Sequence, residues 1–220
     1  MTKKPGMTEA EWLVSADRQA MFRVVRARSH SRKCRLFAVA CCRAITPPLP
    51  DPRSCRAIEV AERHADGLAT NEELTRASKQ AGDAHAIAVQ QWGKEGACLE
   101  WGAEFVAWPH PCNAAENVSW AVVNCRKGHE APDYPAQADF IRDIFGNPFR
   151  PVTFEPEWRT SAVIALAEGI YQEGAFDRLP ILADSLQDAG CQNEDILSHL
   201  RGQGPHVKGC WLVDLLIGKS

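Results

Sequence analysis

Residues 199–214, HLRGQGPHVKGCWLVD, bring together side chains that bind metals or act as nucleophiles. With Cys191 just upstream, the segment offers two thiols and two imidazoles, a donor set that suits tetrahedral zinc. The spacing, Cys-x7-His-x6-His-x3-Cys, lacks the tight paired turn of zinc modules. The candidate metal ligands are therefore Cys191, His199, His206 and Cys210, and no catalytic or cofactor-binding residue is assigned.

The same segment has two other interpretations. Cys210 follows a glycine turn near a predicted helix start, where the helix dipole lowers a thiol pKa, and His206 is close enough in sequence to act as its base. Asp214, one helical turn later, lies alongside Cys210 and not behind the histidine. Alternatively the glycines and Pro205 shape a turn, Trp211 packs, and both histidines bond backbone groups. A packed helix junction fits the spacing best.

A second group of metal-type side chains lies in the middle of the chain. It comprises Cys98, His110, Cys112, Cys125 and His129, which could supply a two-cysteine, two-histidine site. His110 and Cys112 alternate with Pro109 and Pro111, which counts against a regular element that would hold the two ligands together. Ligand identity alone supports this site.

The chain has nine cysteines, an odd number with no Cys-x-x-Cys pair. A disulfide framework is therefore not expected, and the thiols are predicted to be reduced and to pack as small apolar groups. The adjacent Cys41 and Cys42 are open to a redox role, but their place on an apolar helical stripe favours packing.

Charge is distributed unevenly along the sequence. Residues 1–43 hold ten Lys or Arg and three Asp or Glu, whereas the rest holds fifteen and twenty-five, for a net charge of −3. Pairing between a basic head and an acidic body explains this asymmetry, and contact with nucleic acid is the alternative. The basic side chains for that alternative are Arg23, Arg26, Arg28, Arg32, Lys33 and Arg35.

Composition indicates an ordinary globular protein. Of 220 residues, 45% are hydrophobic and 24% are charged, and no run approaches the ~20 apolar residues of a bilayer span. No apolar stretch follows the first lysines, so no secretory signal is expected. We predict a cytoplasmic protein with no membrane partner.

Hydrophobic spacing predicts an all-α fold of nine or ten short-to-medium helices around a single core, with no strand. Capping boxes begin at Thr8 and Thr70, and Asp177 is expected to cap the helix that follows it. The proline-rich segment 147–158 reads as an extended strap between an N-terminal part, 1–145, and a C-terminal part, 146–220. No phosphate-binding loop, dinucleotide fingerprint, His-Glu-x-x-His or Gly-x-Ser-x-Gly motif is present.

Several blocks together resemble a family of short bacterial proteins that occur in many copies, alone or fused to other modules. The blocks are RKCRLFAVACCRAI, RSCRAIEVAERHADGLAT, GNPFRPV, AFDRLPILADSLQDAGC and DILSHLRGQGPHVKGCWLVDLLIGK. The family has no assigned activity, so the resemblance implies a coherent bacterial domain and transfers no site residue. It does not extend over residues 80–131, which here carry tryptophans and three cysteines.

The expected function is a non-catalytic, helical protein-interaction or regulatory module whose partner is another protein. The first alternative is a zinc-dependent or thiol enzyme centred on His199, His206 and Cys210. The second is nucleic-acid binding through residues 23–35, with strongly salt-dependent affinity. The sequence specifies no cofactor.

Overall fold

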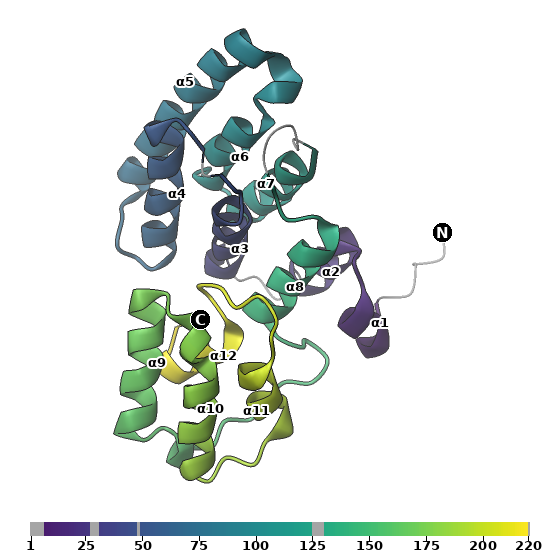
Figure 1. The fold of residues 1–220 in the computed structure, drawn as a ribbon, viewed down its shortest axis with the longest axis vertical. Helices are drawn as coiled ribbons and strands as arrows, with labels where there is room; N and C mark the ends of the chain where they lie inside the picture. The colour runs from purple at the N-terminus through teal and green to yellow at the C-terminus, as the bar shows by residue number, and fades with distance from the viewer. Residues whose placement is uncertain (1–6, 27–30, 48, 125–129, 220) are drawn as a thin grey trace. The chain divides into compact units, whose positions relative to one another are not determined.

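The computed structural model describes residues 7–26, 31–47, 49–124 and 130–219, with the side chains of Arg26 and Glu95 excepted. These residues form twelve α-helices and two short 3-10 helices, so the predicted all-α fold is confirmed (Figure 1). The predicted nine or ten helices undercount the described ones, because segments as short as six and seven residues form separate helices around buried side chains. The described ranges contain no β-strand, and their β-type pairing is limited to one isolated antiparallel bridge between Thr46 and Glu130. No described helix has both the length and the apolar character needed to cross a bilayer.

The chain divides into two compact units at positions that differ from the predicted boundary. Unit 2 is residues 15–138, and unit 1 combines residues 1–14 with 139–220. The boundary therefore falls inside helix α8 (Tyr134–Phe145) and not at the strap after residue 145. The first helix groups with the C-terminal unit, which local sequence patterns do not indicate.

Unit 2 is built around α3, which is buried along most of its length. Helices α4, α6 and α7 contact α3, and α5 packs against α4 and α6. Gly93, with φ +74°, kinks α5 near its end. The helices are α2 (Arg18–Arg26), α3 (Ser31–Arg43), α4 (Pro52–Ala65), α5 (Asn71–Gly96), α6 (Cys98–Val106) and α7 (Pro111–Asn124).

Unit 1 has its own apolar cluster, formed chiefly by leucine, isoleucine and valine side chains between residues 163 and 216. Helices α10 and α12 pack against α9, and α11 packs against α10. The helices of this unit, besides the end of α8, are α1 (Glu9–Val14), α9 (Ser161–Glu173), α10 (Leu179–Asp188), α11 (Glu194–Arg201) and α12 (Trp211–Ile217), with 3-10 turns at Pro156–Trp158 and Phe176–Arg178.

Most helix starts follow from local hydrogen bonds. Thr70 and Glu73 form the predicted capping box, and Thr8 with Glu11 forms the same reciprocal pair. The predicted cap at Asp177 is wrong, because Asp177 lies inside a 3-10 turn and α10 begins after Arg178 without a side-chain cap.

The strap after α8 joins the first helix to the rest of unit 1. The Asn147 side-chain amide donates to Glu9 Oε1 over 2.7 Å, and Arg150 pairs with the same carboxylate at 3.3 Å. The Phe149 ring meets Trp12 edge-on, with centroids 6.4 Å apart. The strap thus holds α1 through polar and aromatic contacts together.

Candidate metal centre

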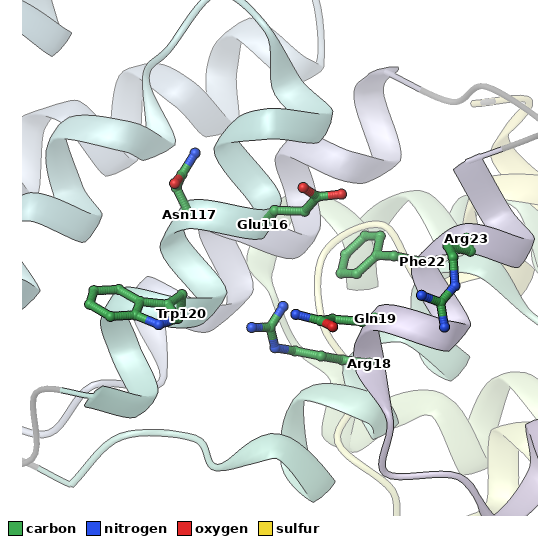
Figure 2. Close-up of a pocket in the computed structure, with 7 residues that line it drawn as sticks. All are labelled: Arg18, Gln19, Phe22, Arg23, Glu116, Asn117 and Trp120. Atoms are coloured by element: carbon green, nitrogen blue, oxygen red, sulfur yellow. The ribbon is translucent and has the colours of Figure 1, made fainter.

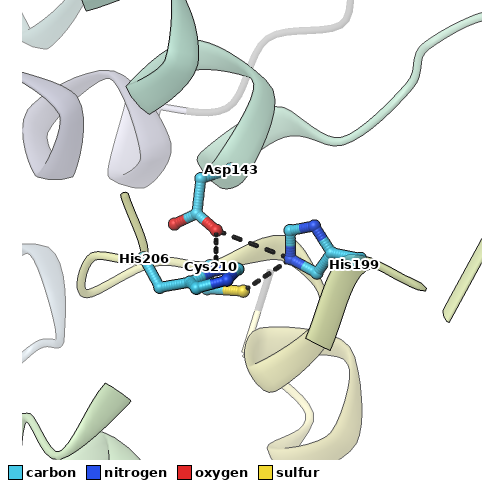
Figure 3. Close-up of side chains that lie close together, drawn as sticks. All are labelled: Asp143, His199, His206 and Cys210. Atoms are coloured by element: carbon cyan, nitrogen blue, oxygen red, sulfur yellow. Dashed lines mark hydrogen bonds and ion pairs between the residues drawn. The ribbon is translucent and has the colours of Figure 1, made fainter. Parts of the chain in front are cut away.

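Four metal-type side chains from four separate stretches converge inside unit 1. They are Asp143 on α8, His199 on α11, His206 in the loop that follows, and Cys210 at the start of α12. One potential ligand atom from each lies within 4.8 Å of all the others (Figure 3). The cluster therefore brings one oxygen, two nitrogens and one sulfur to a common point.

Apolar packing positions the helices that carry these groups. Ile196, Leu197 and Leu200 bury one face of α11, which leaves His199 at the edge of that face. Leu212 and Val213 anchor α12 immediately after Cys210. The loop between these helices, residues 202–210, has no regular secondary structure, so its path is set by turns and side-chain contacts.

Asp143 is the central acceptor of the cluster, and its side chain is 4% exposed. One carboxylate oxygen, Oδ1, lies 2.7 Å from His206 Nδ1, and the other, Oδ2, accepts the backbone N–H of Val207 over 2.9 Å. A single acidic side chain therefore fixes two consecutive residues of the loop. The buried carboxylate is compensated by these donors, as a buried charge must be.

Both ring nitrogens of His206 face oxygen acceptors. Nδ1 faces Asp143, and Nε2 lies 3.4 Å from the carbonyl oxygen of Gly202. Burial acts to lower the pKa of His206, but the hydrogen bond and charge of Asp143, with the Gly202 carbonyl, outweigh it and raise the pKa. The imidazolium form satisfies both contacts, since it donates from both nitrogens.

His199 directs one nitrogen at two partners. Its Nε2 lies 3.2 Å from Cys210 Sγ and 3.5 Å from Asp143 Oδ1. Burial lowers the pKa of His199 to about 4, with Asp143 opposing and His206 adding to the effect. The imidazole is therefore neutral at pH 7, which is the form that binds metals.

Cys210 is fully buried beside a carboxylate. Burial and, next, the charge of Asp143 raise the pKa of the thiol well above its ordinary value. Without a cation the sulfur keeps its proton and is not a nucleophile. A metal ion reverses this, because coordination deprotonates a thiol outright.

Three of the four predicted metal ligands belong to the cluster. Cys191 does not: it is buried in the apolar cluster of unit 1, where it packs with the side chains of α9 to α12. The sequence interpretation missed Asp143. Its only local signal is an acid three residues after Phe140 and next to Ile144, inside an apolar helical stripe.

The second predicted metal group does not assemble among the described residues. Cys125 and His129 lie outside the described ranges. Cys98 is disulfide-bonded, which corrects the expectation that all nine thiols are reduced. Cys112 instead lies with its sulfur 3.0 Å from that of Cys34 on α3, a neighbour that linear spacing could not indicate.

The adjacent cysteines of α3 are packing residues. Cys41 and Cys42 are both buried, and burial raises the pKa of Cys42 to about 12 and that of Cys41 well above its ordinary value. Neither is a thiolate at neutral pH, so neither meets the condition for a reactive redox cysteine.

The basic stretch is used partly inside unit 2. Arg35 is buried and donates to the backbone oxygens of Val106 and Pro109, and Arg32 pairs with Asp66. Arg23 is exposed. Because Arg32 and Arg35 are engaged inside unit 2, the predicted row of phosphate contacts loses these two side chains. Arg28 and the side chain of Arg26 lie outside the described part.

The fold and the cluster together define a class: an all-helical protein with a buried centre of mixed oxygen, nitrogen and sulfur donors. Comparison with protein-family models, with curated proteins and with solved structures gives no match. The resemblance to short multi-copy bacterial proteins therefore stays a prediction.

Proposed function

We propose that this chain is a non-catalytic helical module that holds a single zinc ion in unit 1. The ion would cross-link α8 to the loop 202–210, and its ligands would be Asp143, His199, His206 and Cys210. The observation that carries the proposal is the convergence of four ligand atoms of zinc-type chemistry within 4.8 Å. Two imidazoles, a thiolate and a carboxylate are ligands that zinc accepts, whereas magnesium and calcium select all-oxygen sites.

Two of the distances between ligand atoms suit a small tetrahedral ion. Bonds of 2.0–2.3 Å at tetrahedral angles separate neighbouring ligand atoms by roughly 3.3–3.7 Å. His199 Nε2 lies 3.2 Å from the sulfur and 3.5 Å from Asp143 Oδ1, close to those values. The 2.7 Å contact between His206 and Asp143 is a hydrogen bond, which widens by under about 1 Å when the metal replaces its proton.

The outer contacts favour the same assignment. The Gly202 carbonyl faces His206 Nε2, and the Val207 N–H holds Asp143 Oδ2, so both ligands are oriented through their second polar atom. Metal sites generally fix their ligands by such contacts.

Catalysis is disfavoured by the same geometry. Four protein ligands complete a tetrahedral shell, whereas a catalytic zinc keeps one position open for water. A cysteine–histidine–acid triad needs the imidazole to bond the thiol through one nitrogen and the acid through the other. His199 presents a single nitrogen to both, and Cys210 is fully buried with a raised pKa.

A zinc ion here would act as a cross-link. It would join α8 to the loop 202–210, which lacks helix or strand of its own. Metal binding that orders such a segment contributes directly to folding free energy. The proposed role is therefore to hold a rigid helical surface, and not to transform a substrate.

Metal content of the purified full chain tests the proposal. We expect one zinc per chain by elemental mass spectrometry. Cobalt substitution should give the visible absorption of a four-coordinate ion with a thiolate charge-transfer band. A chain that purifies without metal and fails to bind zinc or cobalt after reduction contradicts the proposal.

Two cysteine variants give a matched comparison. Cys210→Ser should abolish the charge-transfer band and weaken zinc binding, whereas Cys191→Ser should leave both unchanged. Both sulfurs are fully buried in unit 1, so loss of a buried thiol is common to the two. Asp143→Asn and Asp139→Asn form a second pair on α8, because Asp139 is an exposed partner of Arg142 outside the cluster. Equal effects within either pair would contradict the ligand assignment.

A further inference from the structure

Unit 2 contains a small cavity between α2 and α7 that is separate in residues and chemistry from the metal centre. It is open to solvent on one side and has a volume of about 350 Å³, at the lower end of the range of small-molecule pockets. Helix α2 contributes Arg18, Gln19, Phe22 and Arg23 to its lining. Helix α7 contributes the rest, as Figure 2 shows: Glu116, Asn117 and Trp120.

Arg18 is the unusual member of this lining. Only 6% of the residue is exposed, yet its Nε has no hydrogen-bond partner. Buried arginines are otherwise paired, because an unmet charged donor is strongly unfavourable. In Figure 2 the guanidinium extends from α2 toward Trp120, beside the amide of Gln19.

No described side chain forms an ion pair or a hydrogen bond with the Arg18 guanidinium. Its ring contact is with Tyr134, whose centroid lies 5.0 Å from the guanidinium carbon. That contact holds one face of the guanidinium and leaves its edge of N–H donors directed elsewhere. Cys41 is near enough for the charge of Arg18 to act on it, but burial raises the pKa of Cys41, so this thiol is neutral.

The remaining lining selects the ligand class. Two arginines and one glutamate give the cavity a net charge of +1, which suits a monoanion better than a doubly charged phosphate. The planar edge of a guanidinium matches a carboxylate, with two parallel N–H···O bonds.

Aromatic walls define the rest of the ligand. Phe22 is buried and is held edge-on against Phe37, with centroids 4.8 Å apart. Trp120 is 45% exposed and is held by Trp101, 5.7 Å away between centroids. A large, fixed and half-exposed indole beside a cavity offers a flat surface for stacking.

We propose that this cavity binds a small planar monocarboxylate, with the carboxylate on Arg18 and the flat apolar body against Trp120 and Phe22. The ligand supplies acceptors to the terminal N–H groups of Arg18, since the unpaired Nε is itself buried from solvent, and it covers the exposed part of the indole. The inference is independent of the metal proposal, since the two sets of residues share no member.

Fluorine NMR of the purified full chain with 4-fluorobenzoate tests this directly. The probe should bind saturably at one site. The affinity for the uncharged 4-fluorobenzamide should be lower by about tenfold or more, because charge-assisted hydrogen bonds are roughly twice as strong as neutral ones. Acetate and inorganic phosphate should compete poorly, since acetate lacks the ring and phosphate carries the wrong charge.

Variants locate the site. Trp120→Ala should weaken 4-fluorobenzoate binding by about fivefold or more, as expected for loss of one stacking surface. Trp92→Ala is the matched control, since Trp92 is 53% exposed on α5 and does not line the cavity. Arg18→Met should abolish binding. If that variant does not fold, the tryptophan pair and the benzamide comparison still decide the question.

Three results would overturn the proposal. One is the absence of saturable 4-fluorobenzoate binding at millimolar concentration. Another is equal affinity for the acid and its amide, which would show that Arg18 makes no ion pair with the ligand. The last is displacement of 4-fluorobenzoate by phosphate at lower concentration than by unlabelled benzoate, which would assign the cavity to phosphate.

Discussion

Gly146 lies directly against the indole of Trp211. A Cβ built on Gly146 would come within 3.1 Å of Trp211 Cγ, and the residue has φ +68° at the end of α8. Trp211 follows Cys210, and its ring centroid is 5.2 Å from that of His199. This contact sets the end of α8, which carries Asp143, beside the segment that carries the other ligands.

Gly146→Ala should therefore disturb both stability and the metal centre. The left-handed conformation alone costs an alanine about 1–2 kcal/mol, and displacing the indole adds ~1 kcal/mol or more. Gly174→Ala is the control, because Gly174 also has φ +68° at a helix end in unit 1 but has nothing within 4 Å of its Cβ position. Urea denaturation and zinc titration measure the two effects.

The free energy of unfolding should decrease from wild type to Gly174→Ala and further to Gly146→Ala. Zinc binding should be weaker only in Gly146→Ala. If both variants lose the same free energy of unfolding and bind zinc equally well, the Gly146–Trp211 contact does not position the ligands.

Metal removal should lower the thermal stability of unit 1. A ligand that binds only the folded state at 100 times its dissociation constant stabilises that state by ~2.7 kcal/mol. We expect a chelator to shift the melting transition of the wild type downward and zinc to restore it. Asp143→Asn should melt at a temperature that zinc and chelator leave unchanged. An identical melting temperature of wild-type protein with and without zinc would contradict the structural role.

Zinc binding should release protons, and the affinity should fall as the pH falls. Burial and the charge of Asp143 raise the pKa of Cys210, so the sulfur is protonated at pH 7 and loses its proton on coordination. The pKa of His206 is also raised, because the contacts to Asp143 outweigh burial. The pKa of His199 is lowered to about 4 by burial, so His199 has no proton to release at pH 7.

Titration calorimetry in buffers of different ionisation enthalpy counts these protons. We expect at least one per zinc at pH 7, and fewer in Cys210→Ala. A heat of binding that is independent of the buffer would show that the thiol does not coordinate the ion.

The sequence predicts those parts of the fold that depend on nearby residues. The predicted capping box at Thr70 is confirmed, and Asp51, Thr160 and Asn193 each form the side-chain hydrogen bond that their residue types favour at a helix start. These interactions span two or three residues, so they can be predicted from neighbouring residue types alone. Asp177 fails because a 3-10 turn competes for the same backbone groups.

The candidate site can be predicted only in part, because one of its ligands is distant in sequence from the other three. His199, His206 and Cys210 lie in one short segment, whereas Asp143 comes from a helix far upstream. Cys191 lies 8 residues before His199, and Cys210 lies 11 residues after it, so spacing alone favours neither cysteine as a ligand. Both cysteines belong to the apolar cluster of unit 1, and only tertiary packing, which brings Cys210 and not Cys191 to Asp143 and His199, distinguishes them.

Arg35 provides a test of the nucleic-acid alternative. It is buried, its guanidinium donates to Val106 O over 2.9 Å, and burial lowers its pKa to about 10, so it stays charged at pH 7. Arg35→Ala leaves backbone acceptors unpaired and opens a cavity, and it should lower the free energy of unfolding by about 2–4 kcal/mol. Arg23→Ala, an exposed change in the same basic stretch, should alter the free energy of unfolding by under ~0.5 kcal/mol.

Denaturant unfolding, with salt-dependent DNA binding measured on the same samples, distinguishes a structural role of Arg35 from a phosphate contact. If Arg35→Ala kept wild-type stability and lost affinity for DNA, Arg35 would be a phosphate contact and not a structural residue.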